Sequence, residues 1–136
     1  MNKEELVSTR GYLPEDRNFI LSTFLRGLYY GGSVFSDMPK ALFMNSYHPI
    51  VERILDANVL AIRVSCLKDD PSVILGYSVL NQSATTLHWV FVKKAWRSIG
   101  IAKSLVPSTI STVSHLTKPG KSIIVAKGLI FNPFSI

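Results

Sequence analysis

The clearest candidate for chemistry is a basic turn that follows an apolar run near residue 90. The run HWVFV (88–92) leads into KKAWRSIG (93–100), and an amphipathic segment starts directly afterwards. The first turn of a helix leaves backbone N–H groups unpaired, and the helix dipole favours negative charge there. Gly100 and Ala102 carry little or no side chain, so an anion could approach these amides closely. The turn is therefore predicted to bind a phosphate or pyrophosphate group.

The distribution of charge also favours an anionic ligand. The formal net charge is +6, and all carboxylate side chains lie in residues 1–70. Residues 71–136 contain lysine and arginine but no aspartate or glutamate. Such an excess favours a polyanionic partner, either a nucleic acid or a phosphate-bearing cofactor. A basic surface that serves only solubility is the alternative.

Several common site types are absent from the sequence. The segment GKS (120–122) lacks the earlier glycine of a mononucleotide-binding loop, because His115 stands there, and no G-x-G-x-x-G follows a strand. No group of His, Cys, Asp and Glu has metal-ligand spacing, so no metal site is predicted. No Ser-His-Asp arrangement can be argued either.

The pattern of apolar residues and turn signals predicts alternating strands and helices in one domain, residues 1–136. A proline at position 49 is expected to break the second helical region into two short helices. The segment KSIIVAK is expected to be a buried strand, because it is rich in β-branched residues. The expected elements are a strand at 6–9, a helix from Pro14 to Tyr30, helices around 39–57, strands at 59–67, 72–80 and 85–92, a helix at 98–105, and a strand at 121–127.

The segment R-x-x-G-x-A at 97–102, after a strand ending in V-F-V, resembles the coenzyme A-binding motif of the GNAT N-acetyltransferase superfamily, Q/R-x-x-G-x-G/A. The opening TRGYLPEDRNFI (9–20) is similar to the family's usual first strand and helix start. The resemblance covers roughly residues 6–128. It implies an α+β fold, with a GNAT-like mixed and mainly antiparallel sheet flanked by helices.

The resemblance also implies acetyl-CoA, or coenzyme A, as the cofactor. The backbone of the strand would pair with pantetheine as if with an added strand, and the turn would hold the pyrophosphate through main-chain N–H groups. Lys93, Lys94 or Lys103 could meet the remaining phosphate. The implied cofactor-binding residues are Val90, Phe91, Val92, Arg97, Ser98, Ile99, Gly100, Ile101, Ala102 and Lys103.

The chain departs from the family in its acid and base. Many members use a carboxylate as general base and a late tyrosine as general acid, but this sequence has no carboxylate after Asp70 and no tyrosine after Tyr77. His88 has a suitable intrinsic pKa and is the candidate catalytic base. A histidine packed on a half-buried sheet is the alternative. His48 is expected to cap the second short helix, and His115 to be exposed to solvent.

Three functions follow from these observations. The first is an acetyl-CoA-dependent N-acetyltransferase that transfers an acetyl group to an amine of unidentified class. The second is a catalytically inactive GNAT-fold binding or structural module, of the kind that phages and mobile elements encode. The third is a nucleic-acid-binding protein, which is not favoured because no interleaved basic and aromatic platform and no helix-turn-helix signal is present.

Further features of the sequence predict the location of the protein and its partners. No signal peptide and no membrane-length apolar run is seen, and the single cysteine, Cys66, fits a reducing compartment, so a cytoplasmic protein is expected. The acceptor pocket should come from the loop at 31–39, the two short helices and the tail. The apolar tail (129–136) should fold back as a strand or pair with a second copy, giving a homodimer through the C-terminal edge.

Overall fold

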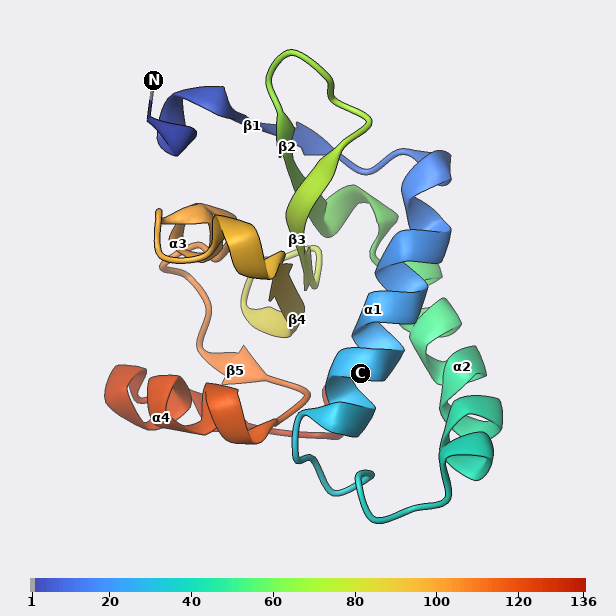
Figure 1. Cartoon of the computed structure of the whole chain (residues 1–136). Helices are drawn as coiled ribbons and strands as arrows, with labels where there is room; N and C mark the ends of the chain where they lie inside the picture. Colours follow the sequence, from blue (N-terminus) through green and yellow to red (C-terminus); the bar gives the residue numbers. More distant parts are fainter. Residues whose placement is uncertain (1) are drawn as a thin grey trace.

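A computed structural model describes residues 2–136, with the side chain of Ser122 left aside, and its centre is one six-stranded sheet (Figure 1). The strands are β1 (Val7–Gly11), β2 (Ile62–Leu67), β3 (Ile74–Leu80), β4 (Thr86–Val92), β5 (Thr112–Val113) and β6 (Ile130–Phe131). The helices are α1 (Arg17–Tyr30), α2 (Lys40–Ala57), α3 (Ile101–Leu105) and α4 (Lys118–Lys127), with 3₁₀ turns at Lys3–Leu6, Pro14–Asp16, Val59–Ala61 and Lys94–Trp96.

The strands lie in the sheet in their sequence order. β2 to β4 form an antiparallel meander, as the turn signals predicted, and β1 pairs antiparallel with β2 at its edge. β5 is parallel to β4, and β6 is parallel to β5. The predicted α+β class, with a mixed and mainly antiparallel sheet flanked by helices, is therefore confirmed. Parallel neighbours need a crossover between them, which α3 and α4 supply.

One irregularity in this sheet matters for the site. Val79 of β3 pairs with Trp89, but the next residue, Leu80, pairs with Leu87. His88 is therefore an additional residue on β4, which makes a β-bulge. A bulge bends its strand and redirects the side chain that it carries.

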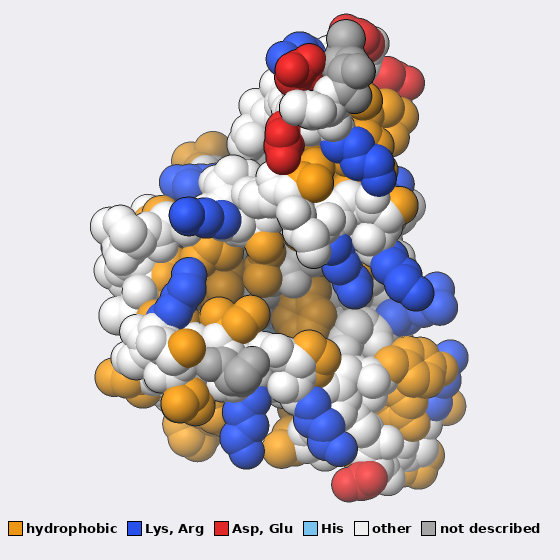
Figure 2. All heavy atoms as spheres, turned by 60° about the vertical axis from the view of Figure 1, so that its left-hand side comes forward, with side chains coloured by type: hydrophobic (Ala, Val, Ile, Leu, Met, Phe, Trp, Pro, Cys, Tyr) orange, Lys and Arg blue, Asp and Glu red, His pale blue; other side chains and the backbone are white. Residues whose placement is uncertain are grey.

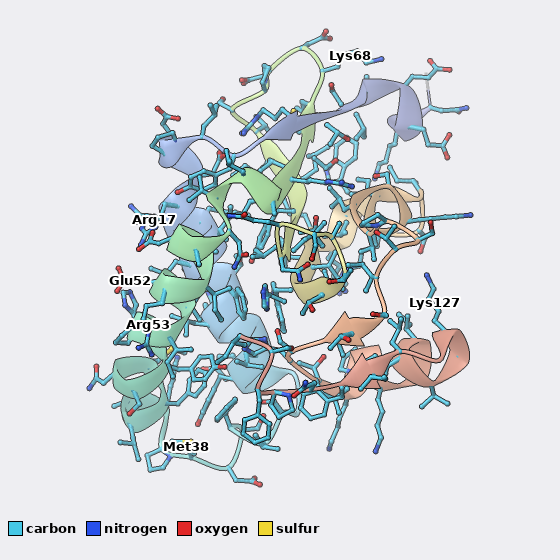
Figure 3. All side chains as sticks on the ribbon, turned by 180° about the vertical axis from the view of Figure 1, so that it is seen from behind. Arg17, Met38, Glu52, Arg53, Lys68 and Lys127 are labelled. Carbon is cyan, nitrogen blue, oxygen red and sulfur yellow. The ribbon has the colours of Figure 1, made fainter. Side chains whose placement is uncertain are left out.

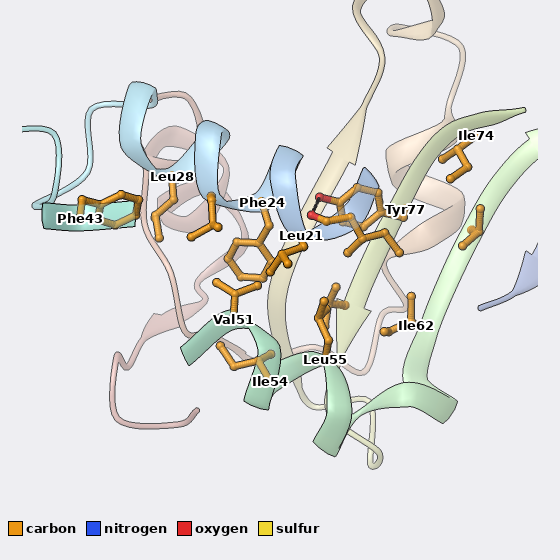
Figure 4. Close-up of a cluster of buried hydrophobic side chains, with 14 residues drawn as sticks. Leu21, Phe24, Leu28, Phe43, Val51, Ile54, Leu55, Ile62, Ile74 and Tyr77 are labelled. Carbon is orange, nitrogen blue, oxygen red and sulfur yellow. Dashed lines mark hydrogen bonds between the residues drawn. The ribbon is translucent and has the colours of Figure 1, made fainter. Parts of the chain in front are cut away.

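Two apolar clusters hold the sheet between helices. On one face α1 and α2 pack on the meander, with Phe24 and Leu28 of α1 buried beside Val51 and Leu55 of α2 (Figure 4). Tyr77 of β3 is fully buried there, and its hydroxyl lies 2.7 Å from Thr23 Oγ1. On the other face α3 buries a smaller cluster, made of Leu75, Val92, Ile101 and Leu105. Figure 1 shows α3 across the sheet from α1 and α2.

The predicted break at Pro49 is wrong, because α2 runs without interruption from Lys40 to Ala57. Pro49 lacks the N–H that would bond one turn back, which removes a single intrahelical hydrogen bond. The helix continues because Phe43 before the proline and Val51 and Leu55 after it are all buried against the same cluster. Tertiary packing thus outweighs the local signal.

The predicted strand at 121–127 is also wrong, since these residues belong to α4 and most of its described side chains are exposed. Local signals at both ends explain the helix. Pro119 stands in its first turn, and Gly128 ends it in the left-handed conformation with φ of 65°. Thr112 and Val113 take the place beside β4 instead. Within the described chain they are the only residues that pair with this edge of β4.

The tail folds back, as one of the two expectations had it. Ile130 and Phe131 form β6 and pair with Thr112 and Val113 of β5. The C-terminus lies beside the end of α1 (Figure 1). Among residues 2–136, no helix has the length and apolar character needed to cross a membrane.

Candidate functional site

The connection between β4 and α3 is an open turn with unpaired amides. Gly100 has φ of +89° and Ser98 has φ of +68°, so the chain twice enters the left-handed region. The backbone N–H groups of Ser98 and Gly100 donate no hydrogen bond within residues 2–136. A Cβ built at Gly100 would meet no atom within 4 Å. The turn thus carries free N–H groups and has open space beside Gly100, although α3 begins at Ile101, later than predicted.

Arg97 and Lys93 flank this turn but point to other groups. Arg97 Nε donates to the carbonyl oxygen of Val92 at 3.1 Å, so the guanidinium ties the turn back to the end of β4. The ammonium of Lys93 lies 5.4 Å from the ring centroid of Phe19 on α1. Trp96 packs against the α3 cluster at the rim of the turn. Lys94 and Lys103 are exposed beside the free amides.

The edge of β4 that faces β5 is open along most of its length. The two strands pair only at Thr86 and Leu87 and then diverge. Lys93 N–H donates to Leu75 on β3 at 2.8 Å, and hydrogen bonding alternates along an antiparallel pair. The backbone groups of Phe91 therefore face β3, whereas those of Val90 face the open side. The strand can accept a further extended segment at Val90.

His88 lies where the two strands diverge. The residue is 3% exposed, so His88 is packed within the sheet at the edge of the gap. Its Nδ1 lies 2.7 Å from Ser114 Oγ, just after β5. Burial lowers the pKa of His88 below its ordinary value. The imidazole is thus neutral at physiological pH and joined to the strand across the gap.

The prediction that His115 is exposed is wrong. The ring packs edge-on against Phe24, with centroids 5.2 Å apart, and Nδ1 lies 2.7 Å from Ser114 Oγ. Its Nε2 lies 2.6 Å from the hydroxyl of Tyr47 on α2. Burial and the neighbouring His88 lower the pKa of His115 to about 4, and burial raises the pKa of Tyr47 to about 12. Four polar side chains therefore stand in one unbroken line.

The sequence did not single out Tyr47 and Ser114. Tyr47 lies 68 positions from its partner His115, and no local pattern marks so distant a contact. The adjacency of Ser114 and His115 was the available signal, but it has meaning only where a second histidine comes close.

Beside this line lies a pocket of about 260 Å³. Its walls come from the loop after α1, from α2 and from the tail, which are the segments expected to build an acceptor site. The lining includes no carboxylate in the part of the chain described. The lining residues are Leu28, Gly32, Ser33, Val34, Phe35, Tyr47, Ser114, His115, Leu116, Thr117, Lys118, Lys121, Phe131 and Pro133.

The face that carries α3 and α4 is hollowed and basic. Figure 2 shows a hollow with an apolar floor, with Lys and Arg side chains around it and carboxylates only towards the upper and lower ends of the view. Lys127 points from α4 towards α3 across this opening (Figure 3). Lys and Arg side chains therefore surround the opening on this face, and Lys127 is one of them (Figure 2, Figure 3).

The carboxylates of α2 face elsewhere. Glu52 lies 3.4 Å from Arg17 of α1, on the side of the molecule away from α3 and α4 (Figure 3). His48 does not cap a helix as predicted; it lies within α2 and pairs with Glu52 one turn later at 3.0 Å. Within the described residues no group of three His, Cys, Asp or Glu side chains could hold a metal ion.

Comparison with protein-family models gave no match, and comparison with curated proteins gave none either. Solved structures do resemble this chain. A GCN5-related N-acetyltransferase from Rhodopseudomonas palustris has 14% identity and a TM-score of 0.49, over 90% of this chain and 68% of that one. AAC(6')-Iy, in complex with a CoA-containing bisubstrate analogue, has 16% identity and a TM-score of 0.47, over 90% of each chain.

A third similar structure is PH1933 from Pyrococcus horikoshii OT3, with 14% identity and a TM-score of 0.45 over 73% of this chain. This chain spans 66% of the length of PH1933, just under two thirds. The function is accordingly inferred from the geometry of this chain's own residues.

Proposed function

We propose that the chain is an acetyl-CoA-dependent N-acetyltransferase. The observation that carries the proposal is the open edge of β4, which runs from the bulge at His88 to the free amides at Gly100. An extended ligand with an anionic end fits such an edge, because one part can pair as a strand and the other can meet N–H groups. Coenzyme A has this form, with an amide-bearing arm and a pyrophosphate.

Different residues would contact different parts of the cofactor. Val90 offers its backbone N–H and C=O to the amides of the pantetheine arm, and Arg97 fixes the turn through its bond to Val92. Residues 98–102 offer N–H groups to the pyrophosphate. Lys94 and Lys103 lie beside them and would meet the remaining phosphate. The thioester would then lie near His88, next to the pocket described above.

The enzyme would contribute mainly alignment. Holding an amine in the pocket against a thioester at the end of β4 turns a bimolecular reaction into an intramolecular one. Strand amides near the carbonyl would stabilise the developing oxyanion. The cytoplasmic location expected from the sequence suits a cofactor whose thiol must stay reduced.

The second candidate is a binding module without turnover. It is favoured by one observation: no carboxylate lines the pocket, so the family's usual base has no counterpart among these side chains. The transferase binds and consumes acetyl-CoA, whereas a binding or structural module consumes none. A nucleic-acid-binding protein would instead lose affinity steeply as salt rises, without dependence on Gly100.

Titration calorimetry with acetyl-CoA tests the proposed pyrophosphate site in the turn at residues 98–102. Gly100→Glu should abolish binding, because it places bulk and negative charge where the pyrophosphate lies. Gly128→Glu is the matched control, since Gly128 also has positive φ and open space around it but caps α4. Micromolar binding by the wild type and by Gly128→Glu, with none by Gly100→Glu, is expected. Retained binding by Gly100→Glu, or no binding by the wild type, would remove the assignment.

A further inference from the structure

Four side chains form a continuous hydrogen-bonded line from the pocket to the bulge on β4. Tyr47 Oη lies 2.6 Å from His115 Nε2, His115 Nδ1 lies 2.7 Å from Ser114 Oγ, and Ser114 Oγ lies 2.7 Å from His88 Nδ1. Tyr47 lines the pocket, whereas His88 lies at the start of the open edge. The line therefore joins the two places that hold the reactants in the proposed transfer.

The hydrogen bonds can all point the same way. A neutral Tyr47 donates to His115 Nε2, so His115 carries its proton on Nδ1 and donates to Ser114. Ser114 has one proton and gives it to His88 Nδ1, which leaves the proton of His88 on Nε2. The opposite direction is equally complete, with His88 Nδ1 donating first and Tyr47 pointing into the pocket. Two complete directions are what a proton relay needs.

Resting on the proposed acetyl transfer, we propose that Tyr47, His115, Ser114 and His88 relay the proton of the acceptor amine from the pocket to the thioester. An ammonium group in the pocket gives one proton to Tyr47 Oη. Each member passes its own proton on, and His88 gains one at Nδ1. The amine becomes neutral, and His88 passes its own Nε2 proton to the sulfur in the same step, because burial disfavours a charged imidazole there.

The chemical step then balances. The amine nitrogen forms a bond to the thioester carbonyl carbon, the carbon–sulfur bond breaks, and sulfur takes the Nε2 proton of His88 to leave as the coenzyme A thiol. The second proton on the new amide nitrogen passes to His88 Nε2, and the line then runs once in the opposite direction, so that Tyr47 releases one proton to water and every member regains its starting proton. Tyr47 and His88 touch reacting atoms and are the catalytic residues. Ser114 and His115 act through them as relay and positioning residues.

The charges in the pocket favour this direction of transfer. Lys118 and Lys121 line it and no described lining residue is a carboxylate, so an ammonium gains no ion pair there. Loss of a proton relieves the repulsion. The acceptor class that fits is an amine whose molecule carries no other positive charge, such as an amino acid with its carboxylate.

Nitrogen NMR of the imidazoles tests the line without any turnover. We expect His115 to be protonated on Nδ1 and His88 on Nε2 at pH 7, with both neutral. Ser114→Ala should change the nitrogen shifts of both rings, whereas Ser111→Ala, a neighbouring serine outside the line, should change neither. The proposal would be overturned if Ser114→Ala changed the shifts of only one ring. It would also be overturned if the tautomers of His115 and His88 did not allow all the hydrogen bonds to point the same way.

Turnover provides the second test, with acetyl-CoA as donor and glycine, β-alanine or hydroxylamine as acceptor. Hydroxylamine is neutral at pH 7 and needs no base. Ser114→Ala should lower amino-acid acetylation by about 100-fold but hydroxylamine acetylation by no more than about threefold, which a purely structural defect would not do. Ser111→Ala should match the wild type with both.

Calorimetry with acetyl-CoA distinguishes a failure of the proton relay from a failure of the proposed acetyl transfer. If Ser114→Ala binds acetyl-CoA normally and still acetylates amino acids at the wild-type rate, the relay is wrong and the proposed function stands. If the wild type binds no acetyl-CoA, the proposed function fails. If the wild type binds it but acetylates none of these amines, both the transfer and the relay are overturned.

Discussion

Arg10 and Asp16 form a partly buried ion pair that joins the first strand to the first helix. The guanidinium of Arg10 on β1 contacts the carboxylate at 2.7 and 2.9 Å, and the N–H of Leu13 donates to the same carboxylate at 2.8 Å. Asp16 is 3% exposed. All the contacts come from groups that flank the bend between β1 and α1, so the pair fixes the angle at which α1 meets the sheet.

Removing the carboxylate should destabilise the protein. Asp16→Ala leaves the charge of Arg10 partly buried without its partner and frees the Leu13 N–H, so we expect a loss of about 3 kcal/mol in the free energy of unfolding. Urea denaturation at pH 7 measures it. Asp69→Ala, at an exposed position in the β2–β3 turn, should change stability by less than about 0.5 kcal/mol. Equal midpoints for both variants would contradict this account.

The same pair should make stability depend on acid. Burial raises the pKa of Asp16, but the hydrogen bonds from Arg10 and Leu13 outweigh it, so the folded pKa lies below the ordinary value. The stabilisation that the ionised Asp16 provides is therefore complete above the ordinary pKa of an aspartate. It is lost as the pH falls through the lower pKa that Asp16 has in the folded protein. The difference in stability between wild type and Asp16→Asn should be constant near neutral pH and shrink in strong acid. A difference that grows on acidification would show the opposite sign.

The sequence was informative wherever local signals and burial agree. The meander was predictable because β-branched runs alternate with turn signals, and the basic turn because KKAWRSIG (93–100) breaks off the apolar run before it. Helix α4 was misassigned because IIV at 123–125 has strand propensity, while its helical state depends on Pro119 before it and Gly128 after it. Propensity is a weak guide where capping residues point the other way.

The candidate site was only half predictable. His88 stood out through its residue type, and its bulge could not be foreseen, because a register shift depends on the pairing of β3 with β4. The polar line was missed for a different reason. Its contacts join α2, β4 and the segment after β5, and only the tertiary fold brings these together.

Pro49 should limit the stability of α2. The helix runs through it without the hydrogen bond that an N–H at 49 would give, and the residue is exposed. Pro49→Ala restores the bond, so we expect a gain of about 1–3 kcal/mol in the free energy of unfolding. Thermal and urea unfolding measure it. Pro119→Ala is the control, because first-turn N–H groups have no intrahelical acceptor and little should change. A loss of stability in Pro49→Ala would indicate that the proline positions Tyr47.

The charge of the pocket should set the preference among acceptors. Lys118 and Lys121 repel a polyamine and attract a carboxylate, so glycine should have a higher kcat/KM than spermidine, and Lys121→Glu should reduce that ratio by about tenfold. Added salt should reduce the ratio in the wild type as well. Lys68→Glu, on the distant β2–β3 turn (Figure 3), should leave it unchanged. A ratio that responds equally to both variants would mean that net charge, and not the pocket, selects the acceptor.

The C-terminal edge should mediate self-association. Ile130 and Phe134 are 63% and 91% exposed, and the outer edge of β6 pairs with no strand among residues 2–136. Because open edges and apolar tails are normally covered, we expect a second copy to pair there as a homodimer. Sedimentation at micromolar concentrations should show a dimer that Ile130→Lys dissociates, whereas Val34→Lys, an exposed apolar residue on the loop after α1, leaves it intact. A wild-type protein that stays monomeric would mean that β6 alone closes the sheet.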